Sequence, residues 1–184
     1  MTNSNSIPDG KALIKSYSAV DEGNIQDTSS ISEMYNFYEI LLDNLVPSKP
    51  GVRLKMQFYV NGRFATDDSY TCETYSNDAG GNGAGSWKDT AFFLWPPNRN
   101  GPIRNGSNST GLFGKINFYS PLKSNSYKTY WANIYAPYSY NGMGGMVIGG
   151  GGYLGNQDPV TGFQLFFDGD SKINSGEVKV YGWK

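Results

Sequence analysis

Apolar and polar residues alternate with a period of two along most of the chain from about residue 35 onward. The clearest case is VRLKMQFYV (52–60), in which Val, Leu, Met, Phe and Val occupy every second position. Side chains of a strand point alternately to its two faces, so this pattern predicts a half-buried antiparallel strand. Asn61-Gly62 follows at once and predicts a tight hairpin turn, because such turns require positive φ.

Seven further segments have the composition of strands and are bounded by residues that end strands. They are YNFYEILL (35–42), SYTCETY (69–75), TAFFLW (90–95), GKINFYS (114–120), YKTYWANIY (127–135), GFQLFF (162–167) and GEVKVYGW (176–183). Loops rich in Gly, Asn, Ser and Pro separate them, and no segment shows a convincing helical repeat. The sequence therefore predicts an all-β fold of two packed antiparallel sheets, a jelly-roll-like β-sandwich.

The first 30 residues are mostly polar and irregular, apart from the short stretch KALIKSYSAV (11–20). We interpret residues 1–30 as an extended N-terminal arm or lead-in strand, and residues 31–184 as the sandwich domain. Two alternatives are open for the arm. It is a poorly ordered terminus, or it docks on a neighbouring subunit.

Composition fits one domain of this kind and argues against several functional classes. The 184 residues include 24 Gly, 14 Tyr, 10 Phe and 4 Trp, which suit strands and turns. A formal net charge of −1 provides no basic field for nucleic acid. The longest apolar runs fall far short of the roughly 20 residues that span a bilayer. We expect a soluble protein, made in a cytoplasm, with no nucleic-acid or membrane partner.

The chain contains no histidine, which removes the commonest general base and the commonest metal ligand. Its single cysteine, Cys72, lies in a predicted strand and has no histidine to activate it, so we expect a small buried residue. A glycosidase would need two carboxylates facing each other at about 5–10 Å, and the sequence shows no such pairing. We therefore expect no enzymatic activity and no cofactor.

Three glycine-rich segments invite functional interpretations. NGMGGMVIGGGGYLGN (141–156) lacks the lysine of a phosphate-binding loop and has no helix after it, so it predicts a glycine-rich strand. SNDAGGNGAGSWKD (76–89) predicts a long exposed loop, in which Trp87 is a candidate contact residue. PPNRNGPIRNGSNSTG (96–111) predicts another polar loop.

Aromatic residues supply the main candidate ligand site. One face of YKTYWANIY carries Trp131 and Tyr135, together with Tyr127, Thr129 and Asn133. Such a face can stack on sugar rings while the amide and hydroxyl groups form hydrogen bonds. The same side chains also suit a sandwich core or a subunit interface, and these alternatives stay open. Tyr138 and Tyr140, just past a proline, are candidates in an exposed loop.

Asp168 and Asp170 lie one residue apart and raise the question of a calcium loop. The EF-hand pattern counted from Asp168 fails, because Lys172, Ile173 and Lys179 stand where ligands or glycine are required. A different calcium site that uses the two aspartates stays open. The simpler prediction is a turn that joins residues 162–167 and 176–183 into a hairpin.

The end of the chain, VTGFQLFF followed by a polar turn and INSGEVKVYGWK, resembles the C-terminal signature of a family of bacteriophage virion proteins. That signature has a Thr-Gly apolar strand, a short turn, a Ser-Gly segment and a Tyr-Gly near the terminus. YNFYEILLDNLVPSKPGVRLKMQFYVNG (35–62) resembles the opening strands of the family. The matching C-terminal residues are Thr161, Gly162, Leu165, Ser175, Gly176, Val178, Val180, Tyr181 and Gly182.

The resemblance spans roughly residues 33–184, with the acidic turn at 168–172 as its main departure. It implies a non-enzymatic role in a tail-fibre-like or capsid-decoration protein on the virion surface. It also implies assembly with other virion proteins and with copies of the chain, and a host-surface glycan is a further expected partner. It supplies no catalytic residues. The alternative from the residues alone is a lectin-like carbohydrate-binding module.

Overall fold

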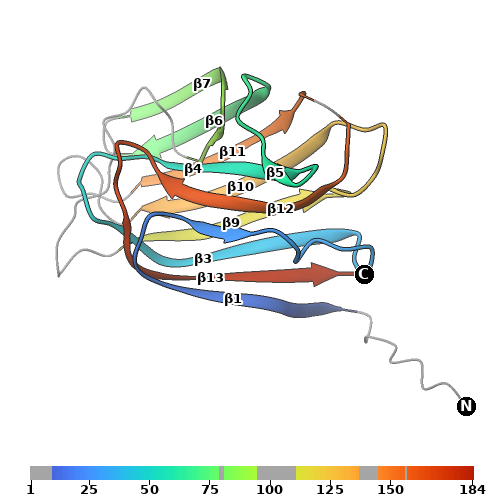
Figure 1. The fold of residues 1–184 in the computed structure, drawn as a ribbon. Helices are drawn as coiled ribbons and strands as arrows, with labels where there is room; N and C mark the ends of the chain where they lie inside the picture. The colour runs from blue at the N-terminus through green and yellow to red at the C-terminus, as the bar shows by residue number, and fades with distance from the viewer. Residues whose placement is uncertain (1–9, 79–80, 95–110, 137–144, 156) are drawn as a thin grey trace, which may run out of the picture.

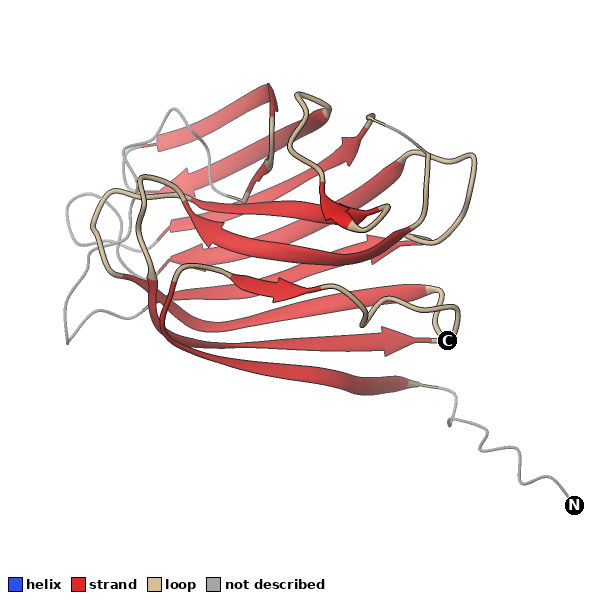
Figure 2. Ribbon diagram, viewed as in Figure 1, coloured by secondary structure: helices blue, strands red, loops and turns tan. Residues whose placement is uncertain are grey.

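The structure is a computed structural model that describes residues 10–78, 81–94, 111–136, 145–155 and 157–184. These residues form two antiparallel β-sheets packed against each other, and they contain no helix (Figure 1, Figure 2). The predicted all-β, jelly-roll-like antiparallel sandwich is therefore confirmed. The described part of the chain accordingly has no helix that is long and apolar enough to cross a membrane.

The two sheets differ in size. In spatial order, the larger sheet contains β1 (Lys11–Glu22), β13 (Ile173–Trp183), β3 (Phe37–Pro47), β9 (Leu112–Tyr119), β10 (Lys128–Ala136), β11 (Gly145–Tyr153), β6 (Tyr70–Asp78) and β7 (Gly81–Asp89). The smaller sheet contains β2 (Ile25–Asp27), β12 (Val160–Phe167), β4 (Leu54–Val60) and β5 (Arg63–Phe64), and β8 (Phe92–Phe93) also pairs with β4. The predicted strand at 90–95 thus shortens to two residues.

The first and last strands lie side by side at one edge of the larger sheet, blue and red in Figure 1. β1 pairs with β13 from Lys11 opposite Trp183 to Glu22 opposite Ile173. Residues 11–22 and 25–27 of the expected arm are thus strands that pair within this sandwich. Residues 1–9 lie outside the described part of the chain, and a docking role for them stays a prediction.

The alternation in 52–60 gives the burial that it predicts, except that the outward Gln57 is buried as well. Leu54, Met56 and Phe58 of β4 are fully buried between the sheets, while Lys55 and Tyr59 face outward and are only partly buried. The following turn has φ of 51° at the asparagine and 79° at the glycine, so the predicted positive-φ turn joins β4 to β5. Cys72 is buried in β6, also as expected.

Phe58 and Tyr70 join the two sheets. The Phe58 ring of β4 lies 5.4 Å from Phe118 of β9 and 6.3 Å from Tyr153 of β11, measured between ring centroids. The Tyr70 hydroxyl of β6 accepts a hydrogen bond from the Phe58 N–H (2.9 Å) and donates one to the Ala65 carbonyl (3.0 Å). A buried hydroxyl needs such partners, so these bonds fix the larger sheet against the backbone of the smaller one.

Two predictions about connections are wrong. The stretch 76–89 is not a long loop, because β6 extends to Asp78 and pairs along its length with β7 at the edge of the sheet. β7 is held by main-chain pairing with β6. Its residues are mostly small, so the sequence shows no apolar repeat from which this strand could have been predicted. Residues 162–183 are not a hairpin either, because β12 belongs to the smaller sheet and β13 to the larger one. The turn at 168–172 therefore carries the chain across the sandwich.

Gly162 of β12 lies against the backbone of β2 and leaves no room for a side chain. A Cβ atom at this position would be 2.0 Å from the Asp27 carbonyl oxygen. We expect Gly162→Ala to lower the free energy of unfolding by about 1–3 kcal/mol, as overpacking usually does, in urea denaturation followed by circular dichroism. Gly23→Ala is the matched control, since a Cβ atom there meets nothing within 4 Å. Equal losses in both variants would contradict this packing.

Buried tyrosines make the free energy of unfolding depend on pH in the alkaline range. Burial, with a smaller contribution from the Asp67 charge, raises the pKa of Tyr153 to about 12. Burial also raises the pKa values of Tyr70 and Tyr130 well above the ordinary value of about 10. Because the folded state holds these protons more tightly, their contribution is complete below pH 10, and the part due to Tyr153 is lost as the pH rises through about 12. We expect the free energy of unfolding to fall over this range, with a late phase of tyrosine ionisation that accompanies unfolding. A single ionisation phase near pH 10 without loss of stability would exclude this linkage.

Candidate functional site

The outer surface of the larger sheet carries exposed aromatic side chains. Trp131 and Tyr135 of β10 are 46% and 47% exposed, and Tyr119 of β9 is 53% exposed. They belong to rows whose neighbours along each strand point into the core. Tyr75 of β6 is exposed in the next row of the same face. We call Tyr75, Tyr119, Trp131 and Tyr135 the aromatic face.

The glycine run of β11, which the sequence predicts as a strand, makes room for aromatic rings of β10. A Cβ atom at Gly150 would lie 3.0 Å from Cε3 of Trp131, and one at Gly151 would lie 2.9 Å from Cε1 of Tyr130. The indole therefore covers the β11 backbone on the outer surface, and the Tyr130 phenol covers it on the core side. This contact gives Trp131 a fixed support although half of it stays exposed.

A row of polar side chains crosses the sheet beside Trp131. Asn117 of β9 lies opposite Trp131, and Glu39 of β3 lies opposite Asn117. Glu39 accepts a hydrogen bond from Lys11 Nζ and lies 4.0 Å from Lys115 Nζ. Asn117 is only 7% exposed, and its Oδ1 has no hydrogen-bond partner among the described residues. A buried oxygen without a partner typically costs about 1–3 kcal/mol of stability.

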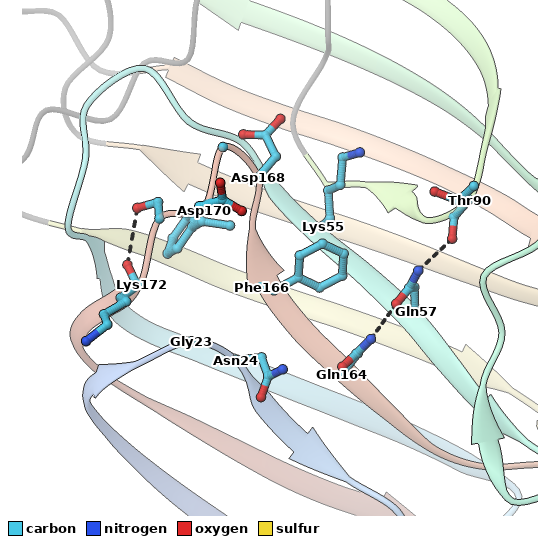
Figure 3. Close-up of a pocket in the computed structure, with 13 residues that line it drawn as sticks. Gly23, Asn24, Lys55, Gln57, Thr90, Gln164, Phe166, Asp168, Asp170 and Lys172 are labelled. Atoms are coloured by element: carbon cyan, nitrogen blue, oxygen red, sulfur yellow. Dashed lines mark hydrogen bonds between the residues drawn. The ribbon is translucent and has the colours of Figure 1, made fainter.

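The outer surface of the smaller sheet, on the opposite side of the sandwich, contains a cleft of about 560 Å³ (Figure 3). Lys55 and Gln57 of β4 and Gln164 and Phe166 of β12 form its floor. The turn at 168–172, Gly23, Asn24 and Thr90 surround them. We call this hollow the glutamine cleft.

The amides in this cleft have defined orientations. Gln57 Nε2 donates to the Thr90 carbonyl oxygen (2.8 Å), which can only accept. Gln57 Oε1 therefore accepts from Gln164 Nε2, and Gln164 Oε1 accepts from Gln26 Nε2 at 3.3 Å. The three glutamines lie opposite one another on β4, β12 and β2, so the amides run as one directed chain across the sheet.

The two lysines that line the cleft have anionic partners. Lys55 Nζ lies 3.8 Å from Asp89 Oδ1 and 4.3 Å from the centroid of the Phe93 ring. Lys172 Nζ lies 2.7 Å from Asp21 Oδ2. These contacts leave the cleft with a balanced rather than a positive charge.

Asp168, the first residue of the possible calcium loop, holds the crossing turn. Its Oδ1 accepts a hydrogen bond from the Arg53 N–H (2.8 Å), and its Oδ2 lies 2.8 Å from Arg53 Nε. Gly169 and Asp170 follow with φ of 65° and 53°. No group of three cysteine, aspartate or glutamate side chains among the described residues is placed to hold a metal ion. The turn geometry and the ion pair with Arg53 therefore explain why an aspartate occupies position 168.

Of the predicted ligand residues whose side chains are described, Trp131 and Tyr135 lie on the same exposed face of β10. Trp87 lies in β7, opposite Cys72, in a stretch whose side chains are not described. Tyr138 and Tyr140 lie outside the described residues. Burial raises the pKa of the Cys72 thiol, which keeps it protonated and a poor nucleophile.

Sequence reasoning missed the glutamine cleft. Lys55, Gln57 and Gln164 are visible as polar positions in the alternating pattern, whereas the outward Phe166 is apolar and departs from it. Their meeting depends on the pairing of strands about 100 residues apart, which no local pattern specifies. Comparisons with protein families, with curated proteins and with solved structures gave no significant match.

The ion pair of Asp168 gives a test of the turn. We expect Asp168→Asn to lower the free energy of unfolding by about 1 kcal/mol, because a partly exposed charged hydrogen bond is lost. Asp170→Asn is the matched control in the same turn, since Asp170 is exposed and asparagine also tolerates positive φ. Millimolar calcium should leave the melting temperature of both variants unchanged. A calcium-dependent rise in the unmodified protein that Asp168→Asn abolishes would show a metal site instead.

Proposed function

We propose that the chain is a non-enzymatic structural protein of a bacteriophage particle, exposed on the tail or the capsid. In this proposal it assembles with copies of itself and with other virion proteins through the aromatic face. The resemblance of residues 33–184 to phage virion proteins supports the location in a particle. The observation that carries the mode of assembly is that Tyr119, Trp131 and Tyr135 are exposed on one face of a broad sheet.

The residues that carry the resemblance have packing roles. Val178 and Val180 of β13 are fully buried. A Cβ atom at Gly176 would lie 2.6 Å from a carbonyl oxygen of β3, and one at Gly182 would lie 2.4 Å from the ring of Tyr35. The signature therefore includes residues that fix the packing of β13 against β3 and against Tyr35. This supports a shared scaffold, as expected for structural proteins, rather than a shared reaction.

The chemistry of the aromatic face suits a protein interface. Tyrosine and tryptophan are enriched at the centres of interfaces, where they bury large areas with little loss of side-chain entropy. Glu39 already has cationic neighbours, so covering it does not bury an unpaired charge.

A lectin-like module is the second candidate function. The observation that favours it is that Trp131 lies beside an amide and a carboxylate, the combination that stacks on a sugar ring and bonds its hydroxyls. In this case a host-surface glycan, rather than a virion protein, would cover the aromatic face. The two candidates make different predictions for one variant.

We expect Trp131→Ala to fold but to be incorporated poorly into particles, because it removes the central ring of the proposed interface. The measurement is the amount of the chain, by quantitative mass spectrometry, in purified particles of a phage that carries the variant. Tyr59→Ala is the matched control, since it removes an outward aromatic ring from the opposite sheet. Thermal unfolding of both purified variants checks the fold.

Normal incorporation of a folded Trp131→Ala chain would refute assembly through this face. Absence of the unmodified chain from purified particles would refute the virion role itself. The lectin-like alternative predicts normal incorporation together with loss of binding to a glycan array.

A further inference from the structure

We infer that the glutamine cleft is a binding site for a neutral carbohydrate. In this assignment Phe166 provides the stacking surface, and Gln164 and Asn24 hydrogen-bond the sugar hydroxyls. The site lies on the opposite side of the sandwich from the aromatic face and does not depend on the function proposed for that face.

The directed chain of amides is the first step of the argument. Each primary amide has two N–H donors and two acceptor lone pairs. The described bonds of Gln164 use one donor, toward Gln57, and one acceptor, from Gln26. Its other N–H and lone pair keep a defined direction because the chain fixes the amide plane. A hydroxyl group both donates and accepts hydrogen bonds. The free N–H and lone pair of the Gln164 amide can therefore bond to the hydroxyls of a sugar.

The aromatic ring on the floor is the second step. Phe166 is half-buried, faces outward from β12 and lies in the middle of the cleft in Figure 3. Lys55, its cross-strand neighbour, is turned toward Asp89 and Phe93. The ring thus remains available to the apolar C–H face of a pyranose. Polar amides around one aromatic ring fit a ligand with one apolar face and a polar rim.

Charge and size select the ligand class. A phosphate or a nucleic acid would need cations that are not already neutralised, whereas Lys55 and Lys172 contact Asp89 and Asp21. A cleft of about 560 Å³ falls in the range of roughly 300–1,000 Å³ usual for small-ligand sites. The arrangement therefore favours a neutral oligosaccharide over an anion.

The position of the glutamine cleft would allow a chain that is part of a particle to bind a glycan there. Gln164 and Trp131 lie on opposite outer surfaces, with the buried core between them. A subunit held through the aromatic face would keep the glutamine cleft open to solvent. Glycan binding at the cleft is equally possible for the free chain, so it can be measured without particles.

The test is binding of the purified full chain to an array of neutral and acidic glycans, followed by calorimetric titration of the bound oligosaccharides. We expect binding to neutral glycans, weakened at least about tenfold in Phe166→Ala, the loss typical of a central aromatic contact. Asn24→Ala, an exposed position, should weaken it a few-fold without affecting the fold. Tyr59→Ala is the matched control, because it removes an outward ring of the same sheet that does not line the cleft.

Three results would overturn the assignment. They are the absence of binding to any neutral glycan, binding restricted to acidic glycans, and binding that both Phe166→Ala and Asn24→Ala retain in full. Loss of glycan binding in Trp131→Ala alone would place the sugar on the aromatic face. None of these results depends on whether the chain is incorporated into particles, so failure here and failure of the virion role are separable.

Discussion

The contact of Phe58 with Tyr70 is the constraint on which the rest of the structure depends. Phe58 belongs to the smaller sheet and Tyr70 to the larger one, and both are fully buried. Ring packing and the hydrogen bond from the Phe58 N–H to the Tyr70 hydroxyl set the position of one sheet over the other. Because strand side chains alternate, fixing these inward residues also fixes which side chains face outward.

Two outer surfaces of different chemistry result from this constraint. On the larger sheet, Trp131 lies over Gly150, beside the polar row that ends at Glu39. On the smaller sheet, Gln57 and Gln164 continue as a chain of amides beside Phe166. The first surface has broad aromatic groups, which suit a neighbouring subunit. The second is a bounded hollow with balanced charge, which suits a small polar ligand.

The period-two pattern predicted the faces of strands well and their partners poorly. The burial of Leu54, Met56 and Phe58 agrees with the alternation, although the outward Gln57 is buried as well. The turn at 168–172 was expected to close a hairpin, yet β13 pairs with β1 and β3 while β12 pairs with β2 and β4. Alternation is a property of one strand, whereas the choice of partner depends on contacts distant in sequence. The glutamine cleft could not be predicted for the same reason.

The central claim is that the two outer surfaces have separate roles, with the aromatic face covered in the assembled particle and the glutamine cleft left open. Hydroxyl-radical footprinting of the chain, free and in purified particles, tests it most directly because it reports the exposure of individual side chains. The account predicts that Tyr119, Trp131 and Tyr135 become protected in particles while oxidation of Phe166 is unchanged. Protection of Phe166 with continued oxidation of Trp131 would contradict it.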